Sequence, residues 1–335
     1  MRRAGVFSLV AACLAASATL APLRAEDSRG TGVIHKEIHR LFDQHRQAVV
    51  RVRASDALGI RFGSGFFIDP SGTVYTHAGV VLKADDVIVN FQGRSLPAKV
   101  VASDSRTGIA LLKTDCTSPF IPLGNSDSVP VSSPVLSIGF PEDHDASPAI
   151  GLVAGRDFHQ NGRQFSTSHL RINMAVQPGY GGAPVLNFDG EVIGIVAARI
   201  HEGASCHILP IRAAEKVRGD IARFGELRPG WVGVEVEDAP SPVAGSIARV
   251  VEMKADTPAA KYGLRKGDFL LGINDCNVHS IQDLVDAAFF LTAGEEAKIR
   301  ICRDGEQMSI DVNPILHPNA ELTPLRAETV VPVSQ

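Results

Sequence analysis

The most informative stretch of the sequence is Gly63-Ser64-Gly65-Phe66-Phe67-Ile68-Asp69, and Gly72-Thr73-Val74-Tyr75-Thr76 follows it closely. It lies in a region of short apolar runs that are separated by clusters of Gly, Pro, Asn, Asp and Ser. The clearest runs are residues 48–52, 87–89, 109–112, 135–138, 170–174 and 191–195. Many short strands with such turns favour an all-β barrel or sandwich.

The pattern changes after a helical, charged segment at residues 211–224 and the turn Arg228-Pro229-Gly230. Beyond this turn, strand-like runs surround one clear helix, which we expect over residues 280–291. Ser280 can cap this helix, with Asp283 three residues later. The strand-like runs are residues 232–236, 247–251, 270–273 and 298–302. We therefore expect a small mixed α/β module as a second domain.

Length and composition limit the class of protein. A chain of 335 residues exceeds the usual size of one hydrophobic core, so we expect two domains and a leader. The formal net charge is -4, and hydrophobic residues make up 44% of the chain. Because no basic field exists to bind nucleic acid, we predict no nucleic-acid partner.

The N-terminus has the features of a secretory signal peptide. Arg2 and Arg3 precede an apolar, small-residue run at 4–22, and Ala25 offers a cleavage site before Glu26. We predict a periplasmic or secreted protein with no membrane span after signal cleavage. Two alternatives are a lipoprotein acylated at Cys13 and a single membrane anchor.

Several ordered blocks give the chain a resemblance to a known family. The blocks include the opening stretch at 63–76 together with 84–89, 98–104, 109–113, 123–126, 189–195, 230–234, 257–260 and 262–268. In this order they resemble the HtrA/Deg family of trypsin-like serine proteases with one PDZ domain. The resemblance implies a mainly β fold, in which a chymotrypsin-like double β-barrel is followed by a small α/β PDZ domain.

The resemblance and the sequence pattern together predict the domain boundaries. We expect a signal peptide at 1–25, an N-terminal segment with a short helix at 26–47, and the protease-fold domain at 48–215. A linker at 216–229 then leads to the PDZ domain at 230–314 and a flexible tail at 315–335. The resemblance also implies assembly, either as a homo-trimer or as a mixed oligomer with active relatives.

Glycine occupies all three positions at which the family carries its catalytic triad. Gly79 stands where the motif Thr-Asn-x-His-Val-Val has histidine, and Gly108 stands where the motif Asp-Leu-Ala-Val-Leu-Lys has aspartate. Gly181 replaces the serine of Gly-Asn-Ser-Gly-Gly-Pro, within the former oxyanion loop of Gly179, Tyr180 and Gly181. Hydrolysis by this fold needs a nucleophile, a base and an orienting acid. We therefore predict a catalytically degenerate member that is not an enzyme.

No neighbouring side chain offers a replacement triad. His77 would share a strand face with residue 79, but it would still lack a nucleophile. Asp104 precedes Gly108 by about one turn, and Ser166, Ser168 and Ser205 do not lie in the nucleophile loop. Tyr180 could fill the former cleft or lie on the surface as an ordinary tyrosine.

We expect neither a cofactor nor a metal. His35 and His39 stand four residues apart on the predicted N-terminal helix, but no third ligand accompanies them. A solvated helix face explains this pair.

The PDZ module remains the candidate binding site. PDZ domains bind an extended peptide as an added strand, and backbone amides receive its terminal carboxylate. By resemblance, Trp231, Val232, Gly233 and Val234 form the receiving loop and strand. Leu284, Val285 and Ala288 shape the side-chain pocket, although plain core packing also explains several of these residues.

These observations lead to two functional hypotheses. The first is an exported pseudoprotease that binds peptides or unfolded-protein C-termini as a scaffold, chaperone or regulator. The alternative is an active serine-type endopeptidase of periplasmic protein quality control that uses unrecognised catalytic groups. A purely structural subunit without a peptide ligand is a third possibility.

The cysteines show no metal-binding spacing. Cys116, Cys206, Cys276 and Cys302 are widely scattered and contain no CxxC pair. An oxidising compartment would permit disulfides, and Cys276 with Cys302 is the first pair to test.

Overall fold

The structure is a computed structural model that describes residues 28–142, 144–160, 163–240 and 245–318. The predicted signal peptide and most of the predicted tail lie outside the described residues. Among the helices of the described part, none is long and apolar enough to cross a membrane.

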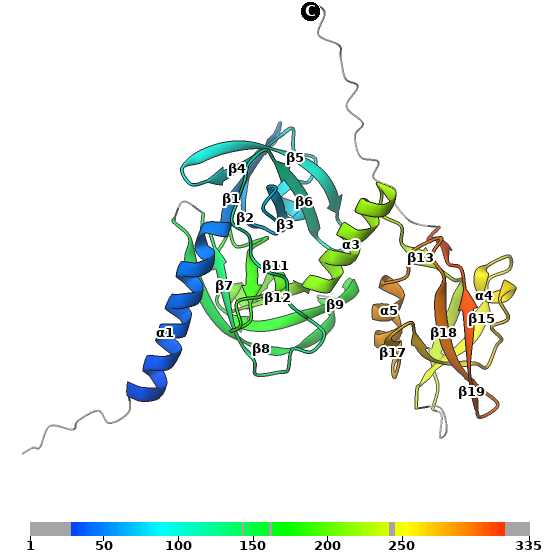
Figure 1. Cartoon of the computed structure of the whole chain (residues 1–335). Helices are drawn as coiled ribbons and strands as arrows, with labels where there is room; N and C mark the ends of the chain where they lie inside the picture. Colours follow the sequence, from blue (N-terminus) through cyan, green and yellow to red (C-terminus); the bar gives the residue numbers. More distant parts are fainter. Residues whose placement is uncertain (1–27, 143, 161–162, 241–244, 319–335) are drawn as a thin grey trace, which may run out of the picture.

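Two closed barrels of six strands each form the first domain (Figure 1). The first barrel has the order β1-β2-β3-β6-β5-β4, and the second has the order β10-β11-β12-β9-β8-β7. The first contains β1 Val49–Asp56, β2 Gly59–Phe67, β3 Thr73–His77, β4 Asp86–Phe91, β5 Arg94–Asp104 and β6 Ile109–Thr114. The second contains β7 Pro134–Gly139, β8 Ser147–Gln160, β9 Arg163–Met174, β10 Pro184–Leu186, β11 Val192–Ile200 and β12 Ser205–Pro210. The predicted double barrel is confirmed.

The opening stretch forms the β2–β3 hairpin of the first barrel. Phe66 of β2 lies opposite Tyr75 of β3, and both side chains are fully buried. Their rings meet edge to face with centroids 5.9 Å apart, an arrangement that aromatic pairs favour. Their neighbours Phe67 and Val74 pack inside the first barrel. Phe66 and Tyr75, by contrast, point to the opposite face and pack in the core that the barrels share with helix α3 (Ile211–Phe224).

Helix α3 (Ile211–Phe224) connects the barrels to the second domain. Its apolar face, which includes Val217, packs into the core shared by the two barrels. The hydroxyl of Tyr75 donates to Glu215 Oε1 at 2.5 Å and fixes the helix on the first barrel. The stretch 216–229, predicted as a linker, is therefore largely a packed helix, which ends at Gly225.

The second domain is a sheet with the order β14-β15-β16-β18-β19 and one covering helix, α5 (Ile281–Phe289). Its strands are β14 Val234–Asp238, β15 Ala248–Met253, β16 Phe269–Ile273, β18 Ala297–Arg303 and β19 Glu306–Val312. The predicted cap is present, since Ser280 and Asp283 form a capping box. Strand β14 lies at the edge of this sheet.

Smaller elements complete the chain. They are α1 Ser28–His45, α2 Ala78–Val81, α4 Pro258–Lys261, β13 Gly230–Trp231, β17 Cys276–Asn277 and β20 Ile315–Leu316, with 3-10 turns at Arg46–Ala48 and His201–Gly203. Strand β20 pairs with β13, so residues 315 and 316 belong to the second domain rather than to a tail. All four described cysteines are free thiols, and Cys276 and Cys302 are not bonded.

Candidate functional site

The three positions predicted for the triad come together around one side chain, His77. A Cβ added at Gly79 would lie 2.9 Å from His77 Nδ1, and one added at Gly108 would lie 2.8 Å from His77 Nε2. A Cβ added at Gly181 would lie 4.0 Å from the Cβ of His77. Gly181 belongs to the second barrel, and its carbonyl accepts from Ser64 N of the first at 2.8 Å. The positions therefore meet where the barrels join.

His77 is the imidazole at this junction. It ends β3 and caps α2, with its Nδ1 accepting from Gly79 N at 3.1 Å. Because Nδ1 accepts, the neutral ring carries its proton on Nε2, which faces Gly108. Burial lowers the pKa of His77 and favours this neutral form. Gly108 has φ +82°, so a side chain there would meet both backbone strain and the imidazole.

Tyr180, next to Gly181 in the chain, does not point to the surface. Its side chain is 3% exposed and packs in the core of the second barrel. The hydroxyl donates to the carbonyl of Ser147 at 2.7 Å, and a Cβ at Gly139 would lie 2.7 Å from the ring. The aromatic ring is therefore a core group of the second barrel, so the interpretation as a surface tyrosine was wrong.

The seven residues predicted to bind peptide surround a single cavity of about 480 Å³. They lie on two walls, and these walls are the loop and edge strand at 231–234 and the helix α5. The lining includes Trp231, Val232, Gly233, Val234, Leu284, Val285 and Ala288. Val232 and Leu284 also belong to the core of this domain, so packing and cavity lining are shared roles.

The loop that leads into β14, at residues 232–233, has backbone amides that can receive an anion. Gly233 has φ +82°, and a Cβ there would lie 2.5 Å from Thr257 Cβ, so only glycine fits. The carbonyls of Val232 and Gly233 accept from Ala259 N and Lys254 N. Among the described residues, neither Val232 N nor Gly233 N has an acceptor. Such amides can receive a carboxylate.

The protease-fold domain supplies a third wall that the sequence did not indicate. It contributes Arg106, Ser166, Lys216, Val217 and Asp220. Lys216 and Asp220 form a buried ion pair at 2.5 Å on α3. Asp220 also accepts from Arg228 N at 3.1 Å and from Thr292 Oγ1 at 3.3 Å. This carboxylate therefore ties α3 to the second domain beside the cavity.

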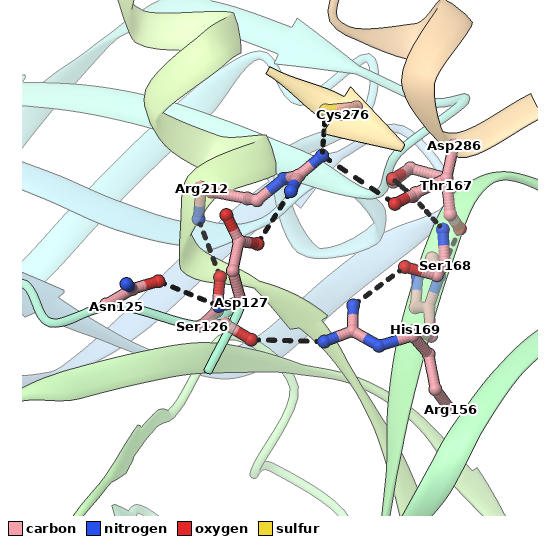
Figure 2. Close-up of polar contacts among 10 residues, drawn as sticks. All are labelled: Asn125, Ser126, Asp127, Arg156, Thr167, Ser168, His169, Arg212, Cys276 and Asp286. Atoms are coloured by element: carbon pink, nitrogen blue, oxygen red, sulfur yellow. Dashed lines mark hydrogen bonds and ion pairs between the residues drawn. The ribbon is translucent and has the colours of Figure 1, made fainter. Parts of the chain in front are cut away.

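A second set of polar contacts holds α5 against the second barrel (Figure 2). Asp286 Oδ1 accepts from Thr167 Oγ1 at 2.5 Å and from Ser168 N at 2.8 Å. Arg212 of α3 lies 3.6 Å from Asp286 and 2.7 Å from Asp127, and its guanidinium stacks 3.7 Å from the ring centre of Phe290. The two domains are therefore docked through hydrogen bonds, ion pairs and a cation–π contact.

Other candidates from the sequence lie apart from the junction or have structural partners. Asp104 is buried and accepts from Arg106 and Thr107, while Ser205 Oγ donates to Asn173. Ser168 lies at the domain contact, and Ser166 Oγ donates to the carbonyl of Arg106. His39 pairs with Asp43 on α1. Within the described ranges, no group of three or more side chains could hold a metal ion.

Comparison with known families settles the two domains. Residues 63–195 match the trypsin-like peptidase domain, and residues 230–313 match the PDZ domain. The chain combines a trypsin-like peptidase domain with one PDZ domain, and this pairing matches the HtrA/Deg-type serine protease family. Its two barrels and its sheet with α5 are the protease-fold domain and the PDZ domain of this HtrA-type chain.

Similar curated proteins are periplasmic proteases. A probable periplasmic serine endoprotease DegP-like from Pseudomonas putida (strain W619) is 34% identical over 267 residues, which cover 75% of this chain and 55% of that relative. A protein of the same name from Halomonas elongata is 30% identical over 263 residues, with the same coverage. The HtrA-type chain thus spans about half the length of the curated relatives it matches.

Solved structures share the fold. The HtrA-type protease AlgW with a tripeptide has a TM-score of 0.70 and 24% identity, and the match covers 84% of this chain and 98% of AlgW. A serine endoprotease from Yersinia pestis has a TM-score of 0.60 and 25% identity over 84% of this chain and 98% of that chain.

These comparisons contradict the prediction that the chain is not an enzyme. The relatives are named serine endoproteases, and the similar structures are proteases. The prediction relied on the side chains missing at Gly79, Gly108 and Gly181. Glycine at these positions removes three functional groups, but it leaves His77 and the backbone amides of the junction in place. The missing side chains alone therefore do not decide activity.

Proposed function

We propose that the chain is a periplasmic HtrA-type protein that binds extended polypeptide C-termini in the groove of its PDZ domain. The observation that carries the proposal is the cavity of about 480 Å³ between the edge strand β14 and α5. An edge strand has unpaired backbone groups that can pair with an added strand. The free amides of Val232 and Gly233 suit a terminal carboxylate.

The lining predicts the chemistry of the ligand's end. The inner part of the cavity is apolar, with Leu264, Leu270, Ile273 and Ile299 beside the predicted residues. An apolar last side chain would bury its surface there, which contributes about 25 cal/mol per Å². The AlgW structures with a tripeptide and with a decapeptide support a peptide as the ligand class.

The periplasmic location is supported by the names of the curated relatives. We propose that unfolded exported proteins are the source of the polypeptide ends, within protein quality control. A homo-trimer or a mixed oligomer with related proteases is the proposed assembly.

The second candidate is a serine-type endopeptidase, which the names of the relatives favour. Such an activity would have to use groups other than the side chains of residues 79, 108 and 181. His77 supplies an imidazole at the junction and is the candidate base. Casein cleavage by the purified chain that is lost in His77→Ala would support this candidate. Cleavage that is unchanged in His77→Ala would exclude His77 from it.

Peptide binding by the full-length chain tests the main proposal. Ala288 lines the cavity, whereas Gln282 of the same helix is exposed to solvent. We expect Ala288→Trp to reduce affinity for a fluorescent peptide with an apolar C-terminus at least tenfold, because the new ring would fill the groove. Gln282→Trp should bind as the wild type does. Equal affinity of both variants and the wild type would contradict binding in this groove.

A further inference from the structure

The barrels of the protease-fold domain contribute a positive charge, that of Arg106, to the wall of the PDZ cavity. This charge is separate from the residues that α3 contributes. Arg106 lies in the turn between β5 and β6 and lines the cavity together with Ser166 of β9. The hydroxyl of Ser166 donates to the carbonyl of Arg106 at 3.2 Å. Since β9 is itself held to α5 through Asp286, this turn is fixed beside the groove.

The guanidinium of Arg106 is only partly engaged. Nε donates to Asp104 Oδ1 at 3.0 Å and Nη2 donates to Oδ2 at 3.2 Å. The carboxylate of Asp104 is 3% exposed and holds this fork in place, while the Arg106 side chain is 38% exposed. Nη1 has no acceptor among the residues that the structure describes. A positioned arginine with a further N–H group is well suited to donate hydrogen bonds to a second carboxylate.

Basic groups gather at the loop end of the groove. Lys254 Nζ lies 5.8 Å from the ring centre of Trp231, and the ring of His317 lies 6.1 Å from the same ring. Burial lowers the pKa of His317, and the charges of Arg106 and Lys254 lower it further. Arg106 and His317 line the same cavity as Trp231, Val232 and Gly233, so the guanidinium faces the space that the loop amides also face.

We propose that Arg106 of the protease-fold domain is a specificity-determining residue of the PDZ groove and pairs with a carboxylate at the C-terminal end of the bound peptide. This inference rests on the proposed function. The carboxylate is either the terminal one or that of an acidic side chain next to the last residue. In both cases a residue of the docked protease-fold domain pairs with a negative charge of the ligand, so both domains take part in peptide recognition.

A double-mutant cycle on the full-length chain measures this pairing. Fluorescence anisotropy compares four labelled peptides with an apolar last residue. These carry either Glu or Gln before that residue and end either in a free carboxylate or in an amide. The wild type is compared with Arg106→Gln and with Arg94→Gln, since Arg94 is exposed on the same barrel and does not line the cavity.

We expect Arg106→Gln to weaken binding about fivefold for the peptides that carry the paired carboxylate, and to leave the others unchanged. A loss confined to free-acid peptides identifies the terminal carboxylate, and a loss confined to Glu peptides identifies the side chain. Arg94→Gln should match the wild type. If Arg106→Gln does not fold, Arg106→Lys takes its place. Because Lys keeps a positive charge beside Asp104, this variant should retain part of the coupling to the carboxylate of the peptide.

If the ratio of wild-type affinity to variant affinity is the same for all four peptides in folded Arg106 variants, the role of Arg106 is overturned and the proposed function still stands. A wild type that binds none of the peptides would overturn the proposed function and this role together. The two failures are therefore distinguishable.

Discussion

The junction between the barrels and the groove of the PDZ domain differ in what their sequences supply. At the junction, Gly79, Gly108 and Gly181 offer only backbone around His77. In the groove, six of the predicted side chains line one cavity together with Gly233, and the amides of Val232 and Gly233 have no acceptor among the described residues. Both regions contain a glycine of positive φ whose backbone approaches a neighbour closely, Gly108 beside His77 and Gly233 beside Thr257, so the regions differ in their functional groups.

This comparison separates two uses of glycine. Gly233 is required by its φ of +82° and by its contact with Thr257. Gly181, by contrast, has room for a side chain, because an added Cβ would meet only the Cβ of His77, at 4.0 Å. Packing therefore demands one glycine and merely accommodates the other.

The largest expected effect on stability is at Gly182, which lies beside the junction. A methyl group at Gly182 would overlap the carbonyl oxygen of Ser64 and lie 2.6 Å from His77 N. Because backbone atoms cannot move aside easily, Gly182→Ala should lower the free energy of unfolding by about 3 to 4 kcal/mol. Urea unfolding followed by circular dichroism measures this. Gly219→Ala on α3 is the control and should be neutral or stabilising by up to about 1 kcal/mol.

The protease-fold domain should lose stability in acid through one buried histidine. Burial lowers the pKa of His169, on β9, to about 4. Between about pH 6.5 and 4 the unfolded chain binds a proton that the folded chain does not, so stability falls as the pH falls. The expected loss from this residue is on the order of 3 kcal/mol at pH 4. Urea unfolding at several pH values should show a shallower loss in His169→Gln. Identical pH profiles would remove this explanation.

Docking of the domains should depend on Asp286. Asp286→Ala removes the acceptor of Thr167 Oγ1 and Ser168 N, which are poorly exposed. Unpaired buried donors cost about 1 to 3 kcal/mol. We therefore expect faster hydrogen exchange in β9 and α5 and a loss of stability of about 2 kcal/mol. Gln282→Ala on the same helix should leave both measurements unchanged, and an equal effect of the two substitutions would argue against this contact.

The smallest effect is expected at Gly181. Since an added side chain meets only an ordinary van der Waals contact, Gly181→Ser should change the free energy of unfolding by less than about 1 kcal/mol. Its unfolding is compared directly with that of Gly182→Ala. A loss similar to that of Gly182→Ala would mean that the junction rejects all side chains equally.

Much of the fold was predictable because local patterns decide it. The turn residues between short apolar runs indicated the strands, and Ser280 with Asp283 indicated the start of α5. The resemblance placed Gly233 in the receiving loop, and its φ of +82° explains why glycine is needed there. The pairing of β20 with β13 could not be read from local patterns, because the paired residues are far apart in the chain, Gly230 with Leu316 and Trp231 with Ile315.

The third wall of the cavity could not be predicted. Arg106 and Ser166 reach the groove only because Asp286 and Asp220 dock the domains, and no local pattern encodes that docking. Burial of Tyr180 likewise depends on Gly139 and Ser147 of the second barrel. The family comparison, and not the spacing of residues, corrected the conclusion about enzyme activity.

Hydrogen exchange of the full-length chain, measured with and without a peptide that has an apolar C-terminus and a free carboxylate, shows whether the PDZ groove binds peptide. Binding in the groove predicts slower exchange at Val232, Gly233 and Val234 and along β14, and an amidated peptide should give much weaker protection. Unchanged exchange in this loop at saturating peptide, with protection elsewhere, would contradict the account.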